Sequence, residues 1–136
     1  MILLDSGPLV ALFDPLDAEH AGCDKTLDTI TDRLVTTTPV LTEAFHLLDP
    51  GSRGASVLRQ YIRDSGLSLW TLGDDAVLRA LDLMEQYEDH PMDFADASLV
   101  AAAESLRITT IFTLNRSDFT TYRPRIGRTL SRFRIL

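Results

Sequence analysis

Four carboxylates stand in apolar surroundings, where an unpaired charge is costly. Asp5 directly follows the apolar run at residues 1–4, and Glu43 lies on the flank of an apolar helical stripe. Asp96 precedes a run of small apolar residues, and Asp118 follows a short β-branched segment. A buried carboxylate must be paired, protonated or bound to a cation, because burying it alone costs several kcal/mol. These four acids are the candidate catalytic and metal-ligating residues.

The elements that position these acids alternate along the chain. Predicted strands cover residues 1–4, 34–37, 67–72 and 108–113, with a last edge strand at 133–136. Predicted helices cover residues 6–13, 26–30, 38–48, 55–66, 74–84 and 93–106, and residues 113–119 are expected to form a turn. Strands that alternate with helices are typical of a parallel sheet covered on both faces. We therefore expect one α/β domain over residues 1–136.

Short polar residues mark the predicted helix starts. Ser6 and Thr38 each precede a proline by one or two residues, which predicts that their hydroxyls cap the following helices. Asp93 and Asp96 are three residues apart, a spacing that fits a cap with an acid in the first turn and also places both on one helix face. Because small apolar residues follow Asp96, we expect it to point inward as a metal ligand. Asp93 is then the cap or an outer-shell residue.

Parallel sheets bind ligands beyond the carboxyl ends of their strands. Asp5 ends the first predicted strand and Asp118 follows the fourth, so acids far apart in sequence are expected to meet at one edge. Thr113, Asn115 and Ser6 lie near the same strand ends and are candidate outer-shell supports.

The available donor atoms indicate the kind of ion that would bind there. Several carboxylates in one pocket repel one another unless a cation is present, and oxygen-only ligands favour Mg²⁺ or Mn²⁺ over Zn²⁺. A single cysteine, Cys23, excludes an internal disulfide and a cysteine zinc site, which fits a cytoplasmic location. His20, His46 and His90 are scattered and are interpreted as ordinary surface or loop residues.

Positive charge gathers near the C-terminal end of the chain. The formal net charge is −7 at pH 7, yet residues 106–136 hold seven arginines and one acid, Asp118. Such asymmetry is a hint of nucleic-acid contact, and it also fits arginines that balance an acidic body or bind an acidic protein. Arginine suits phosphate geometrically, so Arg116 and Arg123 are candidate contacts to a nucleic-acid backbone. The sequence has no membrane-spanning stretch and no signal peptide at its start.

Four motifs together resemble the PIN-domain family, and most closely its VapC kind, the ribonuclease toxins of toxin–antitoxin pairs. The first two are Asp5-Ser6 after an apolar strand and Glu43 within Pro-Val-Leu-Thr-Glu-Ala. The others are Asp96-Ala-Ser-Leu-Val-Ala-Ala and Thr-Leu-Asn-Arg-Ser-Asp118-Phe. The resemblance covers essentially the whole chain in order. Asp5, Glu43 and Asp96 match the three most regular acids of the family.

This resemblance implies a three-layer α/β/α sandwich around a mainly parallel sheet of four to five strands. It also implies Mg²⁺- or Mn²⁺-dependent RNA cleavage, frequent homodimers and a cognate antitoxin. The fourth acid varies in position among members. Here Asn115 holds one of its places and Asp118 the other, which favours one tightly held ion, with Glu43 and Asp118 completing the pocket directly or through water.

Three other interpretations of the same residues stay open at this point. The fold could serve as a non-catalytic module that binds RNA or protein, or the same pocket could act as a structure-specific DNA nuclease. A phosphatase-like hydrolase with Asp5 as nucleophile is disfavoured. Such enzymes usually carry a second aspartate two residues on, where this chain has Gly7, and Lys25 is the only lysine.

Overall fold

Five parallel strands form the central sheet of the computed structural model, which describes residues 1–136. The strand order is β3-β2-β1-β4-β7, with Ile2 of β1 opposite Leu34 of β2 and Leu3 of β1 opposite Ile111 of β4. The strands are β1 Ile2–Leu4, β2 Leu34–Thr37, β3 Ser68–Trp70, β4 Thr110–Phe112 and the edge strand β7 Arg134–Ile135. The predicted mainly parallel α/β sheet is thus confirmed, including its C-terminal edge strand.

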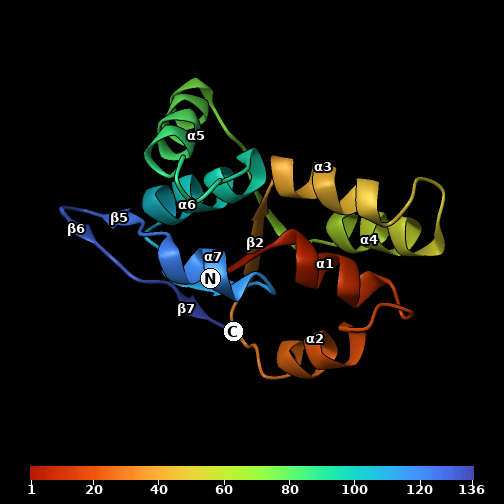
Figure 1. The fold of residues 1–136 in the computed structure, drawn as a ribbon. Helices are drawn as coiled ribbons and strands as arrows, with labels where there is room; N and C mark the ends of the chain where they lie inside the picture. The colour runs from red at the N-terminus through yellow and green to blue at the C-terminus, as the bar shows by residue number, and fades with distance from the viewer.

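Seven helices flank this sheet (Figure 1). In Figure 1, α5, α6 and α7 lie toward one side of the molecule, and α1, α2 and α4 toward the other. Their bounds are α1 Ser6–Phe13, α2 His20–Leu27, α3 Thr38–Leu47, α4 Arg53–Arg63, α5 Asp74–Gln86, α6 Phe94–Leu106 and α7 Arg116–Thr121. None of them combines the length and the apolar character that crossing a bilayer requires.

Helix α6 runs through the core, which decides where its first turn lies. Residues 97–103 of this helix are all buried, because Ala, Ser, Leu and Val side chains let it pack closely on its neighbours. It contacts α5, α3 and β2. On its α5 side, Arg79 forms a two-pronged ion pair with Glu104, at 2.8 and 2.9 Å. Helix α6 thus packs against β2 of the sheet, and its C-terminal end is joined to α5.

Two predicted segments were wrong. The second helix is α2, His20–Leu27, rather than residues 26–30, because Cys23 packs into the core and the His20 Nδ1 atom lies 2.7 Å from the Ala11 carbonyl. Residues 113–119 are not merely a turn, since they lead into α7, which is anchored by the buried Phe119. A hairpin of β5 (Arg125–Ile126) and β6 (Thr129–Leu130) was also not predicted.

Two predicted helix caps were wrong by one residue. Asp5, rather than Ser6, caps α1, because Asp5 keeps the extended backbone of β1 and its Oδ1 accepts from the Ser6 N–H at 2.7 Å. Thr37, rather than Thr38, caps α3 for the same reason, with its Oγ1 accepting from the Val40 N–H. The last strand residue, or the residue directly after the strand, therefore supplies the cap.

Gly54 at the start of α4 marks a close approach that gives a test of the packing. A Cβ at this position would lie 2.5 Å from the Phe13 carbonyl oxygen, a backbone atom that cannot move freely. We expect Gly54→Ala to lower the free energy of unfolding by about 1–3 kcal/mol, the usual cost of overpacking. The control is Gly22→Ala in α2, where nothing lies within 4 Å. Urea unfolding of both variants checks the prediction, and equal stabilities would contradict it.

Candidate metal centre

Asp5 stands at the carboxyl end of β1, at the start of α1. Its side chain is only 6% exposed. Both of its oxygens are held: Oδ1 accepts from the Ser6 N–H, and Oδ2 accepts from the Thr113 hydroxyl at 2.6 Å. Thr113 in turn accepts from the Asn115 N–H at 2.9 Å. The ends of β1 and β4 are thus joined through one carboxylate, which fixes its orientation.

Asp96 lies in the first turn of α6 and points inward, as predicted. It is 8% exposed, and its Oδ2 accepts from the hydroxyl of the fully buried Tyr122 at 3.2 Å. Asp93 is the N-cap of α6, with its Oδ1 accepting from the Asp96 N–H at 2.8 Å. Asp93 therefore holds the helix start that delivers Asp96, while its own side chain reaches solvent.

Glu43 projects from α3 toward the start of α6. It is partly buried and lines a cleft of about 520 Å³ together with His46 and Phe94. This cleft lies between α3 and the N-terminal turn of α6. Glu43 is close enough to Asp5 for its charge to raise the pKa of that carboxyl. Asp5, Glu43 and Asp96, which lie far apart in the sequence, thus belong to one region of the molecule.

Asp118 is held by a histidine that sequence reasoning set aside. The Nε2 atom of His90 lies 2.6 Å from Asp118 Oδ1, and the Asn115 side-chain amide donates to Asp118 Oδ2. His90 does lie in a partly exposed loop, as predicted, but its ring also makes a contact to Asp118 that the sequence did not predict. The contact could not be read from the sequence, because His90 and Asp118 are 28 residues apart and meet only through the packing of a loop on α7.

The acidic side chains raise one another's affinity for protons. Burial, and then the charges of Asp93 and Asp5, raise the pKa of Asp96 to about 8, with Asp118 adding to the effect. Burial also raises the pKa of Asp5, and the charges of Glu43 and Asp93 raise it further. Desolvation and like charges both disfavour the ionised form. At neutral pH this pocket therefore favours the uptake of positive charge, whether as protons or as a cation.

The residues present fit a hard divalent cation in their chemistry. As the side chains stand, no three Asp, Glu, His or Cys groups are arranged to hold one ion directly. The close carboxylates repel one another and are turned toward local donors such as Ser6 N–H, Thr113 and Tyr122. A donor set made of buried carboxylate and hydroxyl oxygens is the kind that Mg²⁺ and Mn²⁺ prefer.

The two candidate arginines, Arg116 and Arg123, differ in whether their guanidinium groups already have partners within the protein. One guanidinium nitrogen of Arg123 donates to the carbonyls of Thr120, Thr121 and Tyr122, so it serves to close the end of α7. Arg116 is exposed and has no ion-pair partner.

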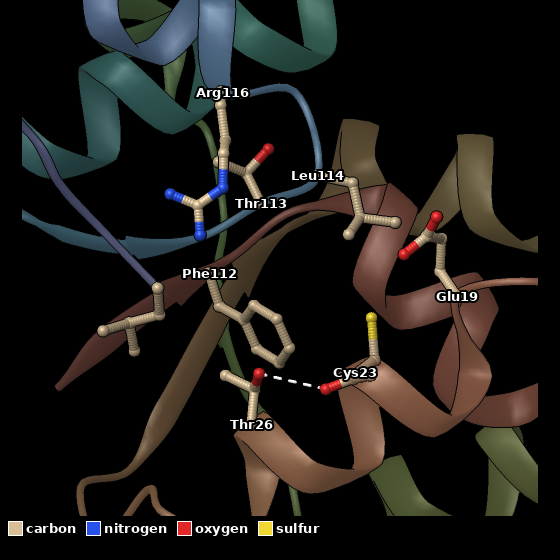
Figure 2. A pocket seen from close by; sticks show the side chains of 9 residues that line it. Glu19, Cys23, Thr26, Phe112, Thr113, Leu114 and Arg116 are labelled. Atoms are coloured by element: carbon tan, nitrogen blue, oxygen red, sulfur yellow. Dashed lines mark hydrogen bonds between the residues drawn. The ribbon is translucent and has the colours of Figure 1, made fainter.

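Arg116 lines a pocket of about 370 Å³ between α2 and the end of β4 (Figure 2). Figure 2 shows Arg116 and Thr113 on one wall, and on the other Cys23 and Thr26 of α2 with Glu19, which directly precedes that helix. Because Thr113 also supports Asp5, this pocket borders the candidate metal centre.

Tyr122 is a second residue that the sequence did not single out. Its ring packs edge-on against Tyr87, Phe119 and His90, with ring centroids 5.2, 5.3 and 5.9 Å away. Burial and the charge of Asp96 raise the pKa of the Tyr122 phenol, so it remains a proton donor to that carboxylate. In the sequence this tyrosine carries no signal that would separate such a role from ordinary core packing.

Comparison with known proteins agrees with this geometry. A family model described as PIN domain matches residues 2–122. Ribonuclease VapC26 from Mycobacterium tuberculosis is 29% identical over 126 residues, which is 90% of this chain and 93% of the relative.

Solved structures share the fold. The crystal structure of Mycobacterium tuberculosis VapC20, described as a Sarcin-Ricin loop cleaving toxin, has a TM-score of 0.78 at 20% identity, covering 87% of this chain and 94% of that one. A toxin–antitoxin complex from Klebsiella pneumoniae has a TM-score of 0.63 at 20% identity, covering 88% and 90%. With the family model spanning most of its length, and with the resemblance seen in its motifs confirmed, this chain belongs to the PIN domain family.

Proposed function

We propose that this protein is a Mg²⁺- or Mn²⁺-dependent endoribonuclease of the VapC kind, acting as the toxin of a type II toxin–antitoxin pair. The observation that carries the proposal is the pair of buried carboxylates Asp5 and Asp96, whose pKa values are both raised by burial and by nearby acids. A structural acid is normally neutralised by a cationic partner, and neither of these has one. A bound cation would complete the site.

In this proposal, Asp5 and Asp96 hold the ion, and Glu43 and Asp118 complete the pocket directly or through water. The ion, when bound, lowers the pKa of a bound water and stabilises negative charge on the scissile phosphate. Glu43 lines the cleft between α3 and the start of α6 and is near enough to Asp5 for their charges to interact, so it can orient or deprotonate the attacking water. Asp93, Thr113, Ser6 and Asn115 orient these carboxylates through their hydrogen bonds.

Contacts to substrate follow from charge. An acidic pocket repels phosphate, so the RNA backbone needs cationic side chains near it. Arg116 has its guanidinium free and borders the support of Asp5, which fits this role. Arg123 also lies near the site, but one nitrogen of its guanidinium is already committed to the end of α7. We therefore propose that Arg116 makes more of the contact to the RNA backbone than Arg123 does.

The assembly and setting belong to the same proposal. We propose that residues 1–136 form a single nuclease domain and that two copies of the protein form a homodimer. We further propose that a cognate antitoxin blocks the acidic pocket and that the protein acts in the cytoplasm. The VapC relatives and the Klebsiella complex support an antitoxin partner.

The test is cleavage of matched single-stranded RNA and DNA oligonucleotides by the purified wild-type protein. We expect cut RNA with Mg²⁺ or Mn²⁺, none with EDTA, and intact DNA in every lane. Cleavage of the DNA oligonucleotide instead of the RNA would show that the substrate is DNA and that the proposed RNA substrate is wrong. Metal-independent cleavage, or no cleavage across a broad RNA panel, would overturn the proposal in favour of a contaminating nuclease or a binding module.

A further inference from the structure

Both carboxylate oxygens of Asp118 are held by neighbouring side chains. Oδ1 lies 2.6 Å from His90 Nε2, and Oδ2 accepts from the Asn115 amide. No lysine or arginine pairs with Asp118. Its position therefore depends on a histidine from one segment and an asparagine from another. Asn115 stands where the family resemblance allows an acid, so its amide donates to Asp118 where a carboxylate would repel it.

His90 is itself fixed in place from two sides. Its backbone N–H donates to the Tyr87 carbonyl at 2.9 Å, which ties the loop after α5. Its ring packs edge-on against Tyr122, with centroids 5.9 Å apart and an interplanar angle of 78°. The Tyr122 hydroxyl donates to Asp96. Tyr122 thus contacts both Asp96 and His90, and His90 in turn holds Asp118.

We expect the contact between His90 and Asp118 to contribute little to the free energy of unfolding. The side chain of His90 is 41% exposed and that of Asp118 is 24% exposed. Exposed ion pairs contribute about 0–1 kcal/mol to stability. A short, well-supported contact that contributes little to stability but lies beside Asp96 is best explained by what it does to Asp118.

We propose that His90 is a positioning residue of the candidate metal centre, which, together with Asn115, holds Asp118 at the rim as an acceptor for water. This inference rests on the proposed nuclease function and deepens it. The Asp118 side chain is 24% exposed, whereas Asp5 and Asp96 are both buried, so Asp118 stays at the rim outside the inner ligand set, and Asp5 with Asp96 holds a single ion. His90 donates its Nε2–H to the carboxylate and does not touch the substrate.

Substitution of His90 tests this role in the full-length protein. We expect His90→Ala to lower kcat for RNA cleavage about 10- to 100-fold, the usual effect of losing an outer-shell partner, with KM unchanged. His90→Gln keeps a donor for Asp118 and should restore most of the activity. Asp89→Ala, an exposed neighbour in the same loop, is the matched control. Urea unfolding should show all three variants within about 1 kcal/mol of wild type.

Two further readouts do not depend on turnover. Nitrogen-15 NMR of the imidazoles should show that the His90 Nε2 resonance shifts between the wild type and Asp118→Ala, because this substitution removes the acceptor. Titration with Mn²⁺, followed by the paramagnetic signal of the free ion, should give one bound ion in both wild type and His90→Ala.

The outcomes separate this inference from the proposed function. Wild-type kcat in His90→Ala, or no restoration by His90→Gln, would overturn the positioning role while leaving the nuclease intact. An unchanged His90 Nε2 resonance in Asp118→Ala would also overturn it. A wild-type protein that cuts no RNA would overturn the nuclease itself, whatever the NMR result.

Discussion

Replacing Asp5 with asparagine should lower the rate of metal-dependent RNA cleavage by more than about 100-fold without unfolding the protein. Loss of an outer-shell group typically costs about 10- to 100-fold, so loss of an inner ligand should exceed that range. Asparagine is as good an N-cap as aspartate, and its oxygen can still accept from the Ser6 N–H. Its amide can donate to Thr113 Oγ1, so the junction of β1 and β4 is retained.

The measurement is the single-turnover cleavage rate of a defined RNA at saturating Mg²⁺, with urea unfolding of the same preparation. Asp75→Asn, an exposed acid in the first turn of α5, is the control and should cleave as the wild type does. A folded Asp5→Asn variant that cleaves at the wild-type rate would remove Asp5 from the mechanism.

Replacing Asp96 with asparagine should stabilise the metal-free protein at neutral pH while it abolishes cleavage. The folded-state pKa of Asp96 is about 8, far above its ordinary value of 3.8. A group with a raised folded-state pKa contributes stability below its unfolded pKa, and this contribution is lost as pH rises toward the folded pKa. At pH 7 the unfolded chain has an ionised Asp96 while the folded protein keeps it largely protonated, so the uptake of this proton disfavours folding by as much as about 4 kcal/mol. Asparagine carries no charge and removes this penalty.

Urea unfolding in EDTA between pH 4 and pH 8 checks this prediction. The wild type should lose stability steadily across this range, while Asp96→Asn should lose much less. The stability of the variant should still depend on pH to some extent, because the pKa of Asp5 is raised as well. Added Mg²⁺ should reduce the difference in free energy of unfolding between the two proteins, because it binds and stabilises the folded wild type. Parallel pH profiles for the two proteins would show that folding does not raise the pKa of Asp96.

Much of this site follows from apolar context alone. Asp5 and Asp96 were expected to be buried because a hydrophobic strand and a run of small residues surround them, and both are. Their meeting follows from parallel strands whose carboxyl ends share an edge. The identity of the cap of α1 did not follow, because it depends on whether the chain turns at Asp5 or at Ser6. That choice is set by the backbone angles of one residue.

The missed residues depend on contacts that have no local pattern. His90 and Tyr122 reach the acids through the packing of a loop on α7, and neither has a periodic or capping signature. Helix α7 itself is short and is anchored by Phe119 and Tyr122, so its sequence could be read only as a turn. Side-chain partners across long sequence separations are the part of a site that tertiary packing alone determines.

The most direct test of a shared ion site is Mn²⁺ binding, measured by the loss of the free-ion paramagnetic signal at pH 8. The wild type should bind one ion tightly, and Asp5→Asn and Asp96→Asn should each lose that binding, whereas Asp75→Asn should retain it. If both variants bind Mn²⁺ as tightly as the wild type, Asp5 and Asp96 do not share a cation, and the proposed metal centre is wrong.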